Sequence, residues 1–542
     1  MSLAFFLTVA ATLLFWNLGQ VALFEPDEGR YADIALTMLR TRDWLIPRMN
    51  HLVHLHKPPL SSWLVATSFR LLGPNEFSAR LPNVLLSLAA LLTTVSLGRL
   101  LFDFKTGLSS AWILLTAPLY LAVSRIVTPD MLLTFLNVFS MGCAASLCFG
   151  SRRPLLSFYG FMLALGLGML TKGPVAWMMT ILPTAAFMIW KKKRWEISGK
   201  HWVFGIATML ALSLGWYVWV AVEKSGTFTY FIQSQLLGRM FKGGVGHKHP
   251  LYYYLIVAPL GFLPWTLFLP SALARGVRTE DLDQRGRIQF LLLWFIIPFV
   301  LFSLFRSKLA TYIVPLFPSL ALLVGHFWRE FGSGKIPLTR PLAVSSWFLA
   351  STYLMIPIAG LIFIKLRPEF IGGLGPRALV SGGVLMLGAW ALMSTALLRK
   401  KFGAVFPLQI GIALAVGFLT LAVLPAIQYK NAKVFAQKIT ELRRPGDEIL
   451  MYEHYFASLP FYLEERIVSV GLPPDPGTFD NDPLWTRYLI SDEHAINDFA
   501  ESPGRIFVLA TEEGFETAKS STRAPLYILF KQQGWILFSN RL

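Results

Sequence analysis

Residues 81–102 read LPNVLLSLAALLTTVSLGRLLF, a stretch whose only charged side chain is Arg99. A membrane-spanning helix needs about 20 mostly apolar residues, because its backbone must be hydrogen-bonded internally while its side chains face lipid. This stretch is both long enough and apolar enough to span a membrane. Similar runs recur from the first residues to about residue 427. The sequence therefore predicts a polytopic α-helical membrane protein.

The composition supports this class. Hydrophobic residues make up 54% of the 542 residues and charged residues only 15%, with a mean hydropathy of +0.54, whereas soluble domains carry about 25% charged residues. The net charge of +18 does not indicate nucleic-acid binding, because the Lys and Arg residues form short clusters between apolar runs. Cys143 and Cys148 fall within one apolar segment, so we interpret them as packing residues.

Thirteen apolar segments are candidate membrane spans. The first has no basic region at its start and continues to spanning length, so we expect a retained helix rather than an export signal. The segments are 1–23, 81–102, 107–124, 130–149, 155–170, 173–190, 202–222, 251–271, 288–305, 309–328, 341–364, 378–398 and 404–426.

The loops between these spans alternate in Lys and Arg content, which predicts their sidedness because positive loops stay in the cytoplasm. The richer set includes the run 191–194, and the other set of short loops is poorer. This pattern predicts a cytoplasmic N-terminus and places the loops 24–80 and 223–250 outside. Beyond a transmembrane domain over 1–427, residues 428–542 resemble short strands separated by polar turns, which predicts a small soluble α/β domain in the periplasm.

Residues 25–31, EPDEGRY, follow the first span and contain the first candidate site. Acidic residues favour the first turn of any helix, so Asp27 and Glu28 could simply start one. However, Asp27, Arg30 and Tyr31 have the i, i+3, i+4 spacing of one helix face. The spacing therefore favours a carboxylate and a guanidinium presented together at the membrane surface.

The second candidate is His56-Lys57-Pro58-Pro59. The prolines keep Lys57 out of the α region and suit the start of a helix just after it. An ammonium beside the unpaired N–H groups of a helix start makes a site for phosphate. The alternative is a lysine whose stem lies along apolar surface while its ammonium reaches water.

Three further outward segments carry charge close to a span. Lys172 lies in TKGP, Arg125 and Asp130 lie in SRIVTPD, and Lys308 precedes Tyr312. Ionisable residues at such positions are candidates for function, although each alone could be an interfacial anchor. Together they place acids and bases on one side of the membrane.

The loop before the eighth span carries Arg239, His247, His249 and the tyrosines 252–254. Tyrosines at this position are also typical of an aromatic belt at the membrane interface. Together with a carboxylate, His56, His247 and His249 would bind a divalent metal if they converged, but their sequence distance leaves that open.

One reaction class fits this set of groups. A sugar on a polyprenyl phosphate has a stable phosphate as its leaving group, which needs cations for charge and no general acid. The attacking acceptor needs at most one carboxylate base. A membrane-embedded site would also admit the long prenyl tail from the lipid.

These motifs resemble the aminoarabinose lipid A transferase branch of the protein O-mannosyltransferase superfamily, which has the integral-membrane glycosyltransferase C fold. The resemblance extends over nearly the whole chain, and the order of the motifs makes it specific. The matching motifs are Asp27, Glu28 and Arg30 in PDEGRYADI, Lys57-Pro58, Asp130, Lys172 in LTKG, His247 with Pro250, and SKLATYIVPLFPSLALL with Lys308 and Tyr312.

The resemblance implies a role for each residue. It implies transfer of a sugar from an undecaprenyl phosphate donor to lipid A or another periplasmic acceptor at the bacterial inner membrane. The sequence departs from the pattern at His56, where the family usually has Glu, which leaves a metal and the exact sugar open. The implied catalytic residues are Asp27, Glu28 and Asp130, the donor phosphate ligands are Arg30, Lys57, Lys172 and Arg239, and the residues lining the substrate are Tyr31, His56, His247, Lys308 and Tyr312.

Two alternatives remain open at this point. A protein O-mannosyltransferase-like enzyme would use a similar donor with a protein acceptor. A transporter or flippase for a lipid-linked sugar would also need many spans and a basic cavity. The centres of the spans are nearly free of charge and there is no obvious internal repeat, which favours an enzyme over a proton-coupled carrier.

Overall fold

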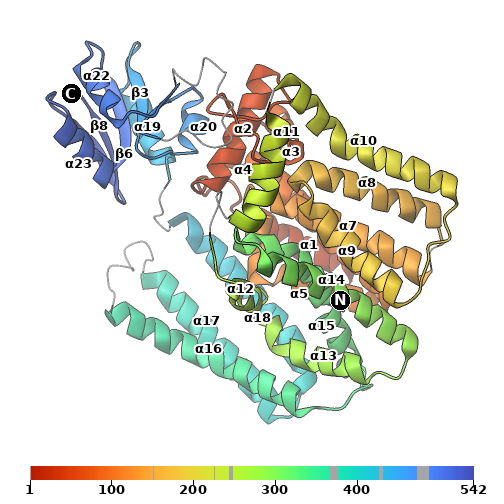
Figure 1. Cartoon of the computed structure of the whole chain (residues 1–542). Coiled ribbons are helices and arrows are strands. Elements are labelled where there is room, and N and C mark those ends of the chain that lie inside the picture. The colour runs from red at the N-terminus through yellow and green to blue at the C-terminus, as the bar shows by residue number, and fades with distance from the viewer. Residues whose placement is uncertain are drawn as a thin grey trace. The chain divides into compact units, whose positions relative to one another are not determined.

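The computed structural model describes residues 2–150, 152–224, 226–242, 248–366, 376–426, 431–472 and 488–542 (Figure 1). The chain divides into two compact units. The first, called the helical unit below, comprises Met1–Leu18, Asn83–Val218 and Ile232–Gln428. The second, called the mixed unit, comprises Gly19–Pro82, Trp219–Phe231 and Tyr429–Leu542.

The helical unit contains most of the apolar helices. Helix α4 begins in the mixed unit and ends in this one, and α10 does the reverse. The elements are α1 (Leu3–Phe15), α4 (Glu76–Leu101), α5 (Phe104–Leu115), α6 (Pro118–Ser124), α7 (Asp130–Phe149), α8 (Pro154–Lys172), α9 (Val175–Trp190), α10 (Gly199–Glu223), the π-helix η1 (Phe231–Lys242), α12 (Tyr253–Gly261), η2 (Trp265–Phe268), α13 (Leu269–Arg278), α14 (Leu282–Leu304), η3 (Ala310–Leu316), α15 (Phe317–Gly332), α16 (Arg340–Leu366), α17 (Pro376–Leu398), η5 (Phe402–Ala404), α18 (Val405–Val423) and η6 (Leu424–Ala426).

The structure confirms a multi-pass helical protein, with fewer full-length spans than the sequence predicts. Among the described residues, nine helices are long and apolar enough to cross a membrane, or eleven if two bent pairs each count as one span. The predicted first and sixth spans correspond to the shorter apolar helices α1 and α9. The predicted total of thirteen is therefore not established.

Two predicted spans are broken. The segment 107–124 forms α5 and α6, which meet at 75°, and the segment 251–271 contains a break of 100° between Tyr253–Gly261 and Trp265–Gly276. Proline explains both positions, because it cannot donate to the helical hydrogen-bond ladder and its ring clashes with the preceding turn. Pro118 begins α6, and Pro264 directly precedes η2.

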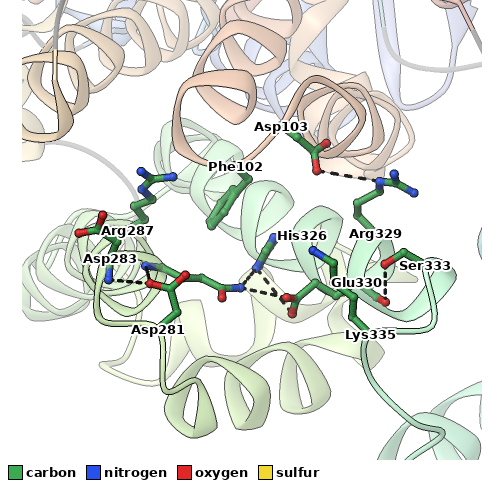
Figure 2. Close-up of a pocket in the computed structure, with 11 residues that line it drawn as sticks. Phe102, Asp103, Asp281, Asp283, Arg287, His326, Arg329, Glu330, Ser333 and Lys335 are labelled. Atoms are coloured by element: carbon green, nitrogen blue, oxygen red, sulfur yellow. Dashed lines mark hydrogen bonds and ion pairs between the residues drawn. The ribbon is translucent and has the colours of Figure 1, made fainter.

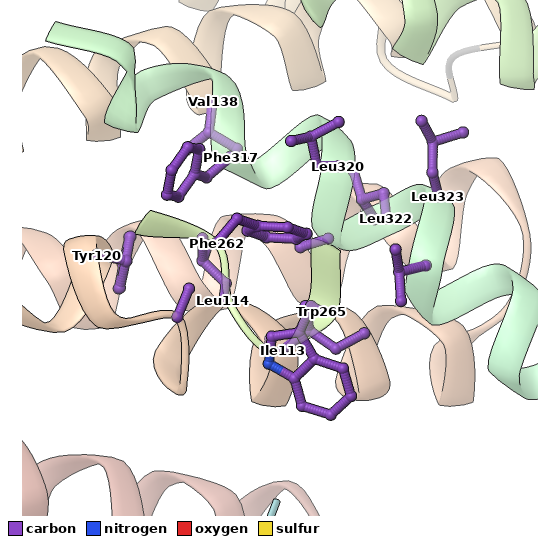
Figure 3. Close-up of a cluster of buried hydrophobic side chains, with 14 of the residues drawn as sticks. Ile113, Leu114, Tyr120, Val138, Phe262, Trp265, Phe317, Leu320, Leu322 and Leu323 are labelled. Atoms are coloured by element: carbon purple, nitrogen blue, oxygen red, sulfur yellow. The ribbon is translucent and has the colours of Figure 1, made fainter. Parts of the chain in front are cut away.

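Close side-chain packing holds the helical unit together (Figure 3). The rings of Phe262 and Phe317 lie 5.2 Å apart, and the indole of Trp265 donates a hydrogen bond of 3.0 Å to Thr116. Glycine lets α4 and α5 approach, since a Cβ on Gly98 would lie 2.3 Å from the Cα of Gly107. Such contacts matter within lipid because association there depends on van der Waals packing rather than on exclusion of water.

The mixed unit is built around a six-stranded sheet of order β5-β4-β3-β6-β8-β7. Strands β3, β4, β5 and β6 are mutually parallel, and β8 pairs antiparallel with both β6 and β7. The strands are β3 (Glu448–Tyr452), β4 (Val468–Val470), β5 (Leu489–Ile490), β6 (Ile506–Thr511), β7 (Tyr527–Gln532) and β8 (Trp535–Ser539).

Helices cover both faces of this sheet, because successive side chains of a strand point to opposite faces. Met451 and Leu509 pack in one cluster with α19 (Lys433–Leu442). Leu450 and Val508 pack in the other cluster with α22 (Ile496–Glu501) and α23 (Glu512–Ser521). The same unit contains α2 (Asp27–Thr41), β1 (Arg48–Met49), β2 (Leu52–Val53), α3 (Leu60–Leu72), α11 (Thr227–Tyr230), α20 (Leu459–Leu463) and η7 (Glu493–Ala495).

Candidate active site

Helix α2 of the mixed unit presents the first pair of predicted site residues. Asp27 is its first residue, and an Oδ1 of Asp27 lies 3.9 Å from an Nη of Arg30 one turn later. Both side chains remain accessible, with 49% of Asp27 and 32% of Arg30 exposed. Tyr31 is half-buried beside them. The predicted pairing of carboxylate and guanidinium is therefore present.

Glu28 has a different environment from its neighbour Asp27. Its side chain is buried and accepts hydrogen bonds of 2.9 and 2.6 Å from the guanidinium of Arg80 and one of 2.9 Å from the Phe24 N–H. Arg80 also donates to the carbonyls of Val21 and Ala22. Glu28 thus lies within a dry ion pair that fixes the chain entering α2.

His56 and Lys57 lie in the segment between β2 and α3. The ring of His56 lies 4.1 Å from that of His54 and stacks at 6.3 Å on that of Tyr230. Lys57 is half-buried, and α3 begins at Leu60. The predicted helix start after the two prolines is therefore present, with Lys57 just ahead of it.

Asp130 and Lys172 meet within the helical unit. Asp130 begins α7, Lys172 ends α8, and their side chains form a buried ion pair. The ammonium of Lys172 also lies 3.7 Å from the centroid of the Tyr312 ring in η3. Asp130, Lys172 and Tyr312 thus form one cluster, in which the charges of Asp130 and Lys172 neutralise each other. In such a buried pair each charge depends on the other, because neither is well solvated.

Lys308 and His249 join two further segments of the same unit. The buried ammonium of Lys308 donates a hydrogen bond of 3.0 Å to the His249 carbonyl, and the His249 ring stacks on Tyr253 at 4.1 Å. Tyr254 donates a hydrogen bond of 3.0 Å to the Leu309 carbonyl. Burial lowers the pKa of Lys308 because it disfavours the charged ammonium.

Arg125 has a structural partner. Its buried guanidinium donates to the carbonyls of Leu13, Leu14 and Trp16 at the end of α1. The last carbonyls of a helix have no partner within the helix. Their partial negative charge makes a cation such as Arg125 favourable at this end.

The predicted site residues therefore fall into two groups. Asp27, Arg30, Tyr31, His56 and Lys57 lie in the mixed unit, and Asp130, Lys172, His249, Lys308 and Tyr312 lie in the helical unit. The backbone of Arg239 belongs to η1, whereas its side chain and all of His247 lie outside the described residues. Within the described residues, no group of three or more His, Cys, Asp or Glu side chains is arranged to hold a metal ion.

Arg80 is the residue that sequence reasoning missed. It lies immediately before the apolar run 81–102, and an isolated arginine at the edge of a span was a signal that it has a specific partner. That partner is Glu28.

A polar pocket of about 330 Å³ lies at the other end of the span that begins near Tyr312 (Figure 2). The His326 ring stacks on Phe102 at 3.9 Å and lies 3.7 Å from Glu330, which also pairs with Arg275 at 2.9 Å. Arg329 also pairs with Asp103 at 4.0 Å. We interpret these pairs as contacts that hold the ends of the helices together.

Comparison with known proteins identifies the family. A family model described as dolichyl-phosphate-mannose-protein mannosyltransferase matches residues 56–219, a stretch that includes Lys57, Asp130 and Lys172. An undecaprenyl phosphate-α-4-amino-4-deoxy-L-arabinose arabinosyl transferase from Pseudomonas aeruginosa is 30% identical over 433 residues, which cover 78% of this chain and 76% of the relative. A relative of the same name from Pectobacterium atrosepticum is 30% identical over 389 residues, covering 70% and 68%.

A solved structure shows the same fold. The crystal structure of ArnT from Cupriavidus metallidurans bound to undecaprenyl phosphate superimposes with a TM-score of 0.84 at 20% identity, covering 99% of this chain and 97% of that one. The chain therefore has the glycosyltransferase C fold. With the identity and coverage given above, it belongs to the family of undecaprenyl phosphate-aminoarabinose arabinosyl transferases.

Proposed function

We propose that this protein transfers 4-amino-4-deoxy-L-arabinose from undecaprenyl phosphate to lipid A at the periplasmic face of the bacterial inner membrane. The observation that carries the proposal is the 30% identity over 433 residues to transferases of that name. The alternation of positive loops supports a cytoplasmic N-terminus and a periplasmic location for residues 428–542. We retain thirteen passes as part of the proposal, with α1 and α9 as short or tilted spans.

The proposed reaction is a substitution at the anomeric carbon of the sugar. A phosphate oxygen of lipid A forms the new bond to that carbon, and the bond from the carbon to the oxygen of undecaprenyl phosphate breaks. The leaving phosphate takes the electron pair, so no proton has to be supplied. Positive charge at the leaving phosphate is then the main requirement for catalysis.

Lys172 is the cation whose setting best suits this role. Asp130 and the Tyr312 ring hold its ammonium in a buried position, where an electrostatic contact is stronger than in water. We propose that it binds the donor phosphate together with Arg30, Lys57 and Arg239, and that Asp130 keeps it oriented.

Asp27 and Glu28 receive different roles. Asp27 is accessible and only loosely paired with Arg30, so we assign it to orienting the acceptor and, for a hydroxyl acceptor, to accepting its proton. The Glu28 carboxylate is paired with Arg80. We therefore propose that Glu28 has a positioning role and not a catalytic one. Tyr31, His56, His247, Lys308 and Tyr312 remain proposed substrate-lining residues.

The experiment is a panel of donors and acceptors with the purified protein in lipid nanodiscs. Labelled aminoarabinose or mannose on undecaprenyl phosphate is offered with lipid A and with a membrane protein extract, and products are identified by mass spectrometry. Label from aminoarabinose in lipid A supports the proposal. Label from mannose in protein instead would show a protein mannosyltransferase, and movement of the donor across liposomes without transfer would show a carrier.

A further inference from the structure

A carboxylate just before α2 is tied to the C-terminal part of the mixed unit. Glu25 accepts hydrogen bonds of 2.9 Å from the Ala457 N–H and 2.8 Å from the Ser458 N–H, and a further one from the Ser458 hydroxyl. All three donors come from more than 400 positions later in the chain. Both oxygens of Glu25 are therefore used to hold this distant segment.

Asn50 makes a second connection between the same parts of the chain. Its backbone N–H donates to Asp33 of α2 at 2.6 Å, and its side-chain amide bonds both the N–H and the carbonyl of Ile467, at 2.9 and 2.6 Å. Asn50 is fully buried. Farther along α2, Arg40 pairs with Glu464. The segment 457–467 is thus connected to α2 near its start through Glu25, near its middle through Asn50 and near its end through Arg40.

The contact at the start of α2 is close enough to require glycine. A Cβ on Gly29 would lie 2.5 Å from the nitrogen of Ser458 and 2.8 Å from the carbonyl carbon of Ala457. Both are backbone atoms, so a methyl group could be accommodated only if α2 and the segment moved apart. The sequence therefore places its smallest residue where the two backbones meet.

We propose that segment 457–467 is a positioning element that sets the orientation of the Asp27 carboxylate. The inference rests on the proposed function of Asp27. Pro26, which precedes the helix, has no side-chain acceptor with which to cap it, so the first turn of α2 is fixed from outside through Glu25. Because Asp27 is two residues from Glu25 and is itself only loosely paired, its direction depends on that anchor.

The expected effect is on turnover rather than on donor binding. A catalytic group displaced by about 1 Å can cost on the order of 100-fold in rate. A purely structural role of Glu25 would instead lower stability or affinity for every substrate. The ratio of the effect on kcat to the effect on KM therefore separates the two roles.

The test uses the full-length protein in nanodiscs with undecaprenyl phosphate-linked aminoarabinose and lipid A. Glu25→Ala removes the anchor, and Gly29→Ala forces the two backbones apart. Gly504→Ala is the matched control, because the nearest atom to its Cβ would be a side-chain oxygen at 3.8 Å in the same unit. Ser458→Ala deletes one donor, whereas Ser458→Thr keeps it. For each variant, kcat, KM for donor and acceptor, the thermal midpoint and the Kd for undecaprenyl phosphate are measured.

We expect Glu25→Ala and Gly29→Ala to lower kcat about 10- to 100-fold, with KM for the donor and the Kd within about threefold of the wild type. Ser458→Ala should be intermediate, and Ser458→Thr and Gly504→Ala should stay within about twofold. If Glu25→Ala or Gly29→Ala does not fold, the Ser458 pair decides, since wild-type kcat in both Ser458→Ala and Ser458→Thr overturns the inference. If Glu25→Ala keeps the wild-type kcat while Asp27→Asn is inactive, the positioning role of the segment is overturned and the role of Asp27 stands. If Asp27→Asn is active, both the role of Asp27 and the positioning role are overturned.

Discussion

The ammonium of Lys172 lies 3.7 Å from the centroid of the Tyr312 ring and also pairs with Asp130. A cation over an aromatic face gains about 0.5 to 2 kcal/mol, toward the upper end when water is excluded. The ring therefore helps to keep a charged lysine where solvation is poor. It also leaves the position of the ammonium defined before any donor arrives.

Replacing Tyr312 should therefore weaken donor binding. We expect Tyr312→Leu to raise KM for the undecaprenyl phosphate donor about 3- to 30-fold, which corresponds to the loss of the cation–π contact. Tyr312→Phe keeps the aromatic face and should stay within about threefold. Steady-state kinetics with varied donor concentration measures both. Equal KM values for the Leu and Phe variants would show that the ring does not hold Lys172 for the donor.

The adjacent acids Asp27 and Glu28 should respond differently to loss of their charge. Asp27→Asn should abolish most transfer while leaving the thermal midpoint unchanged, because its side chain is half-exposed and loosely paired. Glu28→Gln should lower stability by about 3–5 kcal/mol, because it removes the charge that pairs with the buried guanidinium of Arg80. Activity assays and thermal unfolding in detergent give the two readouts. If Glu28→Gln keeps the wild-type stability but loses activity, Glu28 has a catalytic role and not a positioning one.

Stability should depend on pH through Asp33. Burial raises the pKa of Asp33 to about 7, although the Asn50 N–H and Arg40 oppose this shift. Between the pKa of the unfolded chain, near 4, and pH 7 the folded protein holds a proton that the unfolded chain has lost. The contribution of Asp33 is therefore complete below about pH 4 and is lost as pH rises to 7.

Asp33→Asn isolates this contribution, because asparagine is neutral throughout and its oxygen can still accept from Asn50. The thermal midpoint of the wild type relative to that of the variant should fall between pH 4.5 and 7.5. Midpoints that stay parallel over this range would show that Asp33 keeps an ordinary pKa in the folded protein.

The sequence predicts the membrane class well because the chemistry of the bilayer is simple. Any segment within lipid must be apolar and must satisfy its own backbone, so hydropathy alone locates α4, α7 and α14. It does not locate the bend after α5 or the exact number of passes, because Pro118 permits either a kinked helix or a break. Packing of neighbouring helices decides between them, and that is not local in sequence.

Each residue of the candidate site can be predicted from the sequence, but the contacts between these residues cannot. Asp130, Lys172 and Tyr312 can each be recognised as polar residues at the ends of spans, whereas their contact depends on how α7, α8 and η3 pack. The bonds from Glu25 to Ser458 link residues separated by 433 positions. Spacing along one helix, by contrast, is local, which explains why the pairing of Asp27 with Arg30 could be predicted.

The most direct test of the account is the stoichiometry of transfer. Purified protein in nanodiscs is supplied with undecaprenyl phosphate-linked aminoarabinose and lipid A, and both the released undecaprenyl phosphate and the modified lipid A are followed by mass spectrometry. The account predicts one undecaprenyl phosphate released for each sugar gained by lipid A, with both products lost in Asp27→Asn and in Lys172→Ala. Release without gain by lipid A, or transfer that survives both substitutions, would contradict it.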